Sequence, residues 1–275
     1  MSGAAADRFA SYRRSPVSVA VVFHERTTWA DIRSNMWSED QYAGWQGRLS
    51  ISVPLLPSAE ASSLSDVASG LHDADLASLA RELAARGRGS SIIRLGWEFN
   101  GNMWPWSAYD PETYIAAFRR VVLVMRAIAP NLEFEWCGNA MDNQAGHDPF
   151  TELYPGNDVV DIIGLDAYDN QWANAKTTSG FQAWVDRPYG LAAWSNFATA
   201  HDKPFAVSEW GLSVTGEGDN TVYIQGMYDW FSAHASELSY ESYFDEPAYD
   251  VQNALDSGQM PHSSALYARL WHANS

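Results

Sequence analysis

The chain has 275 residues, of which 46% are hydrophobic and 19% are charged, a composition that supports one large core and argues against disorder. Its 34 acidic residues outnumber its 17 basic residues, and the formal charge of -17 disfavours nucleic acid and anionic membranes as partners. No stretch approaches the ~20 apolar residues needed to cross a bilayer. We expect a single domain over residues 1–275, because no linker-like segment divides the chain.

Apolar runs alternate with helical patterns along the chain. In chain order we expect helix 6–14, strand 17–23, strand 49–53, helix 73–86, strand 91–97, helix 112–128, strand 132–137, strand 159–165, helix 191–201, strand 205–208, helix 221–235, strand 238–244 and helix 263–272. Apolar strands that alternate with helices indicate an α/β fold with a parallel sheet covered on both faces. A (β/α)8 TIM barrel needs one more strand, so we expect its first strand to be short or truncated.

Two of the expected strands run into a glutamate beside a tryptophan, Trp97-Glu98 and Glu209-Trp210. Catalytic groups of a (β/α)8 barrel lie at the carboxyl ends of its strands. Alternation along each strand points both glutamates into the barrel mouth, with Arg94 on the same face as Glu98. Hydrolysis of a glycosidic bond requires two carboxyl groups, and tryptophan faces suit the apolar side of a sugar ring. The alternative is an ordinary strand-end carboxylate paired with an arginine.

Three segments of the chain resemble glycoside hydrolase family 26, a clan A family of retaining β-glycosidases of the β-mannanase type. Residues 94–106 (RLGWEFNGNMWPW) resemble its strand-four block, residues 161–168 (DIIGLDAY) its strand-six block and residues 208–211 (SEWG) its strand-seven block. The resemblance implies a (β/α)8 barrel with Glu98 as acid/base and Glu209 as nucleophile. It also implies that Tyr168 hydrogen-bonds the nucleophile. Trp97 departs from the pattern, because the family usually has histidine there.

These residues support double displacement, with Glu98 protonated, Glu209 ionised and the carboxyl groups about 5–5.5 Å apart. We expect an enzyme that cleaves a neutral β-linked polysaccharide internally. The resemblance suggests mannan first, while Trp97 keeps β-glucan, xylan and a microbial surface polysaccharide open. A transglycosylase would use the same residues. A non-catalytic carbohydrate-binding barrel would share the fold and the aromatic lining.

Aromatic and polar side chains near the strand ends are candidate sugar contacts. They are Trp104, Trp106, Trp210, Asn100, Trp136, Asn139, His24, Trp172, Tyr243, Arg94 and Asp166. The aromatic residues have an alternative role in core packing, and the asparagines have one in turn formation.

We expect no cofactor and no metal. Asp142, His147 and Asp148 lack the spacing of a calcium loop, and Cys137, the only cysteine, forms no internal disulfide. We expect a monomer that acts on a polysaccharide or oligosaccharide, without nucleic acid or membrane insertion. Its acidity fits an extracellular or cell-surface enzyme, although residues 1–14 lack the apolar centre of a signal peptide.

Overall fold

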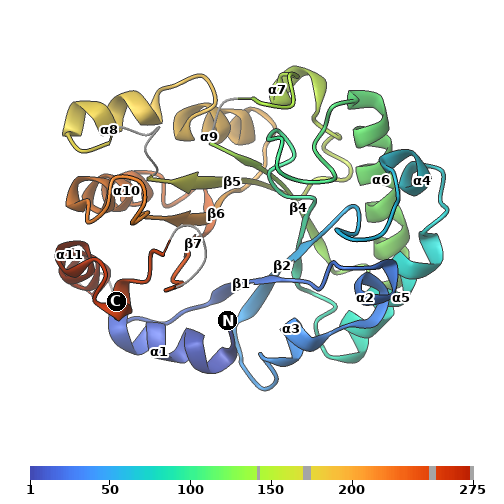
Figure 1. Ribbon diagram of the computed structural model, residues 1–275, viewed down its shortest axis with the longest axis horizontal. Helices are drawn as coiled ribbons and strands as arrows, with labels where there is room; N and C mark the ends of the chain where they lie inside the picture. Colours follow the sequence, from blue (N-terminus) through green and yellow to red (C-terminus); the bar gives the residue numbers. More distant parts are fainter. Residues whose placement is uncertain (141–142, 170–174, 248–251, 273–275) are drawn as a thin grey trace. The chain divides into compact units, whose positions relative to one another are not determined.

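The computed structural model describes residues 1–140, 143–169, 175–247 and 252–272. The described strands follow chain order in one seven-stranded sheet, from β1 to β7 (Figure 1). Contacts between Cα atoms divide the chain into two compact units, Met1–Gly3 with Val19–Gly164, and Ala4–Ser18 with Leu165–Ser275. The single domain over residues 1–275 therefore stays a prediction.

The first unit contains four complete parallel strands and the helices that follow them. Its elements are β1 (Val19–Phe23), α2 (Trp29–Ser34), α3 (Trp37–Asp40), β2 (Arg48–Val53), α4 (Leu64–Ala68), α5 (Asp73–Ala85), β3 (Ile92–Leu95), α6 (Pro111–Ile128), β4 (Glu133–Asn139) and α7 (Pro149–Glu152). Val22 of β1 lies beside Ile51 of β2, which lies beside Ile93 of β3. β2 is buried on both faces, as expected for a parallel strand covered by helices.

Helix α6 shows how sequence determines an element in this unit. Asp110 precedes it, and Pro111 occupies its first turn, where the missing N–H costs no helical hydrogen bond. Its buried residues recur at helical spacing: Tyr114, Ala117, Phe118, Val121, Val122 and Met125. Among the described residues, no helix combines the length and apolar character needed to cross a membrane.

The second unit contains most of α1 and the last strands. Its elements are α1 (Gly3–Arg13), β5 (Ile162–Tyr168), which begins in the first unit, α8 (Thr178–Val185), α9 (Leu191–Ala200), β6 (Phe205–Gly211), α10 (Thr221–Ala233), β7 (Leu238–Tyr243), the 3-10 helix η1 (Leu255–Ser257) and α11 (Pro261–His272). β6 and β7 are parallel, with two register shifts. An aromatic cluster joins α11 to β6, because Trp271 stacks on Tyr267 at 4.0 Å and lies 5.6 Å from Trp210.

Most predicted elements are confirmed, with ends shifted by a few residues. β5 and β6 run on to Tyr168 and Gly211, beyond the predicted ends at 165 and 208. The sequence analysis missed five short helices, α2, α3, α4, α7 and α8. They are too short to show an apolar period, although α2 and α4 begin with capping boxes. In the described part of the chain, α1 begins at Gly3 and no strand precedes it.

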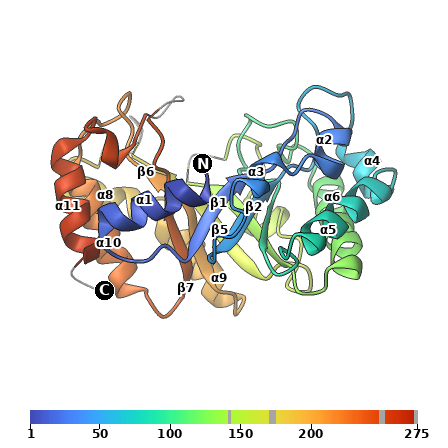
Figure 2. The ribbon, with the colours of Figure 1, turned by 90° about the horizontal axis from the view of Figure 1, so that it is seen from below.

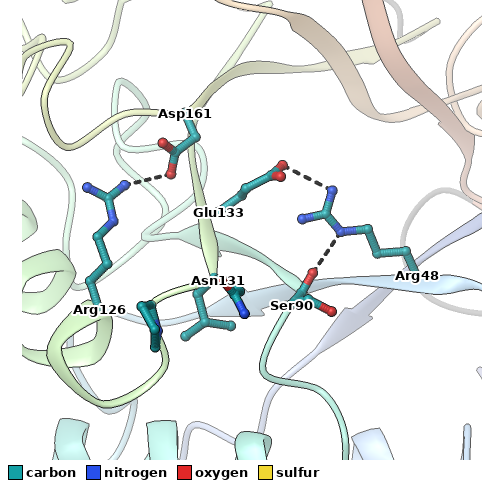
Figure 3. Close-up of a pocket in the computed structure, with 8 residues that line it drawn as sticks. Arg48, Ser90, Arg126, Asn131, Glu133 and Asp161 are labelled. Atoms are coloured by element: carbon teal, nitrogen blue, oxygen red, sulfur yellow. Dashed lines mark hydrogen bonds and ion pairs between the residues drawn. The ribbon is translucent and has the colours of Figure 1, made fainter.

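At the amino ends of the first unit's strands lies a cavity of about 530 Å3 (Figure 3). Arg48 bonds the Ser90 carbonyl at 2.9 Å and pairs with Glu133 at 3.0 Å. Arg126 pairs with Asp161 at 2.7 Å. Each arginine in the cavity wall thus pairs with a carboxylate. These ion pairs stabilise the amino ends of the strands, whereas catalytic groups of such barrels lie at the carboxyl ends.

Candidate active site

Glu98 lies just beyond the carboxyl end of β3, in a strained turn. The strand ends at Leu95, and both Gly96 and Glu98 have left-handed backbones, with φ of 53° and 54°. A non-glycine residue in this region costs about 1–2 kcal/mol. The Glu98 N–H donates to the Cys137 carbonyl of β4 at 2.8 Å, which fixes the turn against the neighbouring strand. Glu98 therefore lies beyond the alternating part of the strand, and its expected place on the face of Arg94 is wrong. Its direction into the barrel mouth stays a prediction.

Both the positive φ and the limited space at position 96 favour glycine there. A Cβ atom there would lie 2.6 Å from Cδ1 of Leu55 and 3.4 Å from Cδ1 of Trp106. The Gly96 N–H donates to the Val53 carbonyl of β2 at 2.8 Å. The turn that presents Glu98 is thus held on both sides, by β2 and by β4.

The Glu98 carboxylate has an aromatic hydrogen-bond donor. Nε1 of Trp104 donates to Oε2 of Glu98 at 2.9 Å. The Trp104 ring lies parallel to Trp106 at 5.0 Å and edge-on to Trp97 at 5.0 Å. The Arg26 guanidinium lies 5.3 Å from the centre of the Trp104 ring. Trp104 is half-buried, so it combines a fixed position with an accessible surface.

The other tryptophans around Glu98 are packed into the core. Trp97, Trp106 and Trp136 have at most 1% of their surface exposed. Nε1 of Trp106 donates to the Trp97 carbonyl at 2.9 Å, and Trp136 stacks on Phe99 at 4.7 Å. Burial gives Trp106 and Trp136 a packing role, and their predicted sugar contacts gain no support from it.

Asn100 and Asn139 are bound to each other. Nδ2 of Asn100 donates to the Asn139 carbonyl at 3.0 Å, and the Asn139 N–H donates to Oδ1 of Asn100 at 2.9 Å. Both residues are buried. The reciprocal pair fastens the segment after β3 to the end of β4, so it holds the backbone that carries Glu98.

Arg94 and His24 are buried and engaged by other protein groups. Arg94 donates to Oγ of Ser52 at 2.9 Å. Nδ1 of His24 bonds Oε1 of Glu39 at 2.7 Å, and its Nε2 lies 2.9 Å from the Ile32 carbonyl. Burial lowers the pKa of His24, but the hydrogen bond and the charge of Glu39 raise it more, so the net shift is upward. Both ring nitrogens are thereby occupied.

In the second unit, Glu209 lies on β6 with 8% of its surface exposed. The Tyr168 hydroxyl, at the end of β5, donates to Oε2 of Glu209 at 2.9 Å. Asp166 has the same strand parity as Tyr168 and is 2% exposed. The structure thus brings together the tyrosine and the glutamate that the family resemblance paired. Trp172, another predicted contact, lies outside the described residues.

Trp210 and Tyr243 belong to the aromatic cluster of the second unit. Trp210 is fully buried, and its Nε1 donates to Oε2 of Glu241 at 2.7 Å. The Tyr243 hydroxyl donates to the Asn253 carbonyl at 2.8 Å. The Trp210 ring packs against Phe231 of α10 and Trp271 of α11, whereas Glu209 bonds Tyr168 of β5, so the two side chains contact different elements. The predicted sugar contacts of Trp210 and Tyr243 gain no support from these positions.

The sequence analysis missed Asp169, which directly follows Tyr168. This carboxylate is fully buried, and burial raises its pKa to about 7. Its Oδ2 accepts from Nδ2 of Asn220 at 2.8 Å, and its N–H donates to the Gly211 carbonyl at 2.9 Å. A polar loop residue gives no signal of burial in the sequence, so only the structure reveals it.

A model of glycosyl hydrolase family 26 matches residues 63–231, which is more than half of the chain. The chain belongs to glycosyl hydrolase family 26. The matched family 26 region contains Glu98, Tyr168 and Glu209.

Two curated relatives align with part of this family 26 chain. Endoglucanase H of Acetivibrio thermocellus is 28% identical over 171 residues, which are 60% of this chain and 18% of the relative. The β-1,3-xylanase TXYA of a Vibrio species is 30% identical over 151 residues, 52% of this chain and 28% of the relative. The chain therefore spans less than a third of either relative.

Solved structures show the fold of the family 26 chain. The catalytic domain of the family 26 endo-β-1,4-mannanase of Bacillus sp. JAMB-750 gives a TM-score of 0.61 at 19% identity, over 88% of this chain and 69% of its own. The YdhT protein of Bacillus subtilis gives a TM-score of 0.64 at 20% identity, over 97% of this chain and 80% of its own. A fungal β-1,4-galactanase gives a TM-score of 0.63 at 15% identity, over 92% of this chain and 88% of its own. The predicted (β/α)8-type fold is confirmed.

Proposed function

We propose that this protein is a retaining, endo-acting β-glycoside hydrolase that cleaves a neutral β-linked polysaccharide. The observation that carries the proposal is the hydrogen bond from Tyr168 to Glu209 in a family 26 chain that also presents Glu98 at a strand end. A donor of this kind holds a carboxylate in one orientation, which a nucleophile requires.

In the proposed reaction, Glu98 protonates the glycosidic oxygen while Glu209 attacks the anomeric carbon. The bond from that carbon to the leaving oxygen breaks, and a covalent sugar ester of Glu209 forms. Glu98, now ionised, takes a proton from water, whose oxygen attacks the same carbon and releases Glu209. The two inversions retain configuration, and they require carboxyl carbons about 5–5.5 Å apart.

Mannan is the first substrate that we propose. The JAMB-750 structure is of an endo-β-1,4-mannanase, while the names of the curated relatives are an endoglucanase and a β-1,3-xylanase. Trp97 stands at the position where the family usually has histidine, and its buried ring packs edge-on against Phe23 at 5.4 Å. A buried ring makes no sugar contact of its own, so β-glucan and xylan belong in the same test.

The setting of the reaction is also a proposal. We propose a monomer that acts outside the cell or at its surface and uses no nucleic acid, cofactor or metal. The net charge of -17 supports a neutral polymer over an anionic one, because like charges repel at the surface.

The test is a screen of the purified protein against mannan, β-glucan, xylan and galactan, with products separated by chromatography. Early release of mixed oligosaccharides is expected for endo action. The matched controls are Glu98→Gln and Glu209→Gln, which keep size and remove the carboxyl groups. Binding without products in the native protein would indicate a carbohydrate-binding barrel, and elongated products would indicate transglycosylation.

A further inference from the structure

Trp37, the first residue of α3, differs from the tryptophans of the core. Its side chain is 65% exposed, whereas Trp97, Trp106 and Trp136 are buried. Its indole makes no hydrogen bond or ring contact with any residue that the structure describes. An exposed apolar residue is common, but an indole is the largest apolar surface a side chain can leave in water.

The position of Trp37 is fixed by contacts of the next two residues of α3. Oε1 of Glu39 bonds Nδ1 of His24 at 2.7 Å, and Oγ of Ser38 donates to Oε1 of Glu25 at 3.1 Å. His24 and Glu25 directly follow the carboxyl end of β1, and Figure 2 shows α3 beside this strand. Trp37 therefore lies at the end of the strands where Glu98 follows β3, because β1, β2 and β3 are parallel.

A short path of contacts joins this segment to Glu98. Arg26, the neighbour of Glu25, lies over the ring of Trp104 at 5.3 Å. Trp104 in turn donates to Glu98 at 2.9 Å. The segment after β1 thus borders the surroundings of Glu98 at one end and carries Trp37 at the other.

We propose that Trp37 is a sugar-binding platform that stacks on a pyranose ring of the polysaccharide, away from the ring that is cleaved. This inference rests on the proposed function and specifies its substrate as a polymer long enough to reach from Glu98 to Trp37. The apolar face of a β-linked sugar covers an indole without requiring a charged partner. Glu25, whose carboxylate accepts from Ser38 next to Trp37, adds negative charge near this residue, which disfavours an anionic chain.

The test compares Trp37→Ala and Trp37→Phe on a long polysaccharide and on a short aryl glycoside. For the polysaccharide, Trp37→Ala raises KM roughly tenfold, the usual scale for truncating an aromatic contact, and leaves kcat unchanged. Trp37→Phe retains most of the affinity, because it keeps an aromatic face. Both variants turn over the aryl glycoside at the native rate, since that substrate does not reach Trp37.

The matched control is Leu123→Ala, which truncates another exposed apolar residue, 57% exposed on α6. It leaves every constant unchanged. If Trp37→Ala leaves the KM for the polysaccharide unchanged, the inference is overturned. An equal rise in the KM for the aryl glycoside overturns it as well.

A binding measurement separates this inference from the proposed function. In Glu209→Gln, iodide quenches the fluorescence of the exposed Trp37, and long polysaccharide protects it more than short oligosaccharide does. The quenching is assigned to Trp37 by its loss in Trp37→Phe. If the native protein hydrolyses no polysaccharide while this protection is observed, the proposed hydrolysis fails and the platform stands. Hydrolysis without protection overturns the platform alone.

Discussion

The hydroxyl of Tyr168 donates to Oε2 of Glu209 at 2.9 Å, from the end of β5 to the neighbouring strand β6. The bond is short enough to orient the carboxylate, and both residues are fixed on strands rather than on loops.

Tyr168→Phe is expected to lower kcat by roughly tenfold or more, because a hydrogen bond to a charged group is worth about 1.5–3 kcal/mol. The phenyl ring keeps the edge contact with Phe244, so the midpoint of urea unfolding should change little. Steady-state kinetics across the pH range provide the measurement. Native turnover at every pH would refute the role of the hydroxyl.

Glu209→Ala is expected to abolish hydrolysis of every substrate, because it removes the group that forms the covalent intermediate. Added azide should restore part of the rate by attacking from the vacated side, and it should yield the glycosyl azide of inverted configuration. NMR of the product determines the configuration. A retained azide would reverse the assignment of Glu209.

Glu98→Ala is expected to lose activity on polysaccharide, whose leaving alcohol needs a proton. An aryl glycoside with an acidic phenol leaves unaided, so its first step should survive. Azide should then speed the release of the intermediate and give the glycosyl azide of retained configuration. Behaviour identical to that of Glu209→Ala would show that the two glutamates do not have different roles.

Gly96→Ala is expected to destabilise the protein by more than its backbone strain alone. Gly87→Ala is the matched control, since Gly87 also has a positive φ, 71°, but an added Cβ there would meet nothing within 4 Å. We expect Gly87→Ala to cost about 1–2 kcal/mol in unfolding free energy, and Gly96→Ala about 1–3 kcal/mol more from the contact with Leu55. Urea unfolding measures both. Equal losses would mean that Leu55 moves aside easily.

Asp169→Asn is expected to make folding stability less dependent on pH. Burial raises the pKa of Asp169 from 3.8 to about 7, so between these values the folded protein keeps a proton that the unfolded chain has released. Rising pH therefore favours unfolding, by at most about 1.4 kcal/mol per pH unit, and the effect stops above pH 7. Among the described residues, the polar or charged groups that interact with this carboxylate are Asn220, Glu217, Lys176, Tyr223 and Tyr243.

The measurement is urea unfolding at pH 5 and at pH 8. At each pH we take the unfolding free energy of Asp169→Asn minus that of the native protein. This difference should be larger at pH 8 than at pH 5. Subtracting the native protein's stability removes the contributions of the other titrating groups. Among them is Asp245, whose pKa is also raised to about 7 by burial. An equal difference at the two pH values would contradict the assignment.

The strand that carries Glu209 could be predicted because its apolar run is typical of a parallel strand that is buried on both faces. Trp210 packs against Phe231 of α10, although its aromatic character suggested a sugar contact. Glu98 was located by its motif, but its direction was not predictable, because φ of 54° is set by contacts with β2 and β4 that the local sequence does not encode. The burial of Asp169 depends in the same way on Asn220, which is distant in sequence.

The cavity at the amino ends of the strands has a practical consequence. Asn131 in its wall is exposed, and the protein's one thiol, Cys137, is buried. Asn131→Cys would therefore introduce a single reactive thiol on the end of the first unit opposite Glu98. Coupling through that thiol would immobilise the protein on a solid support in one orientation, with the carboxyl ends of β1 to β4 directed towards the solution.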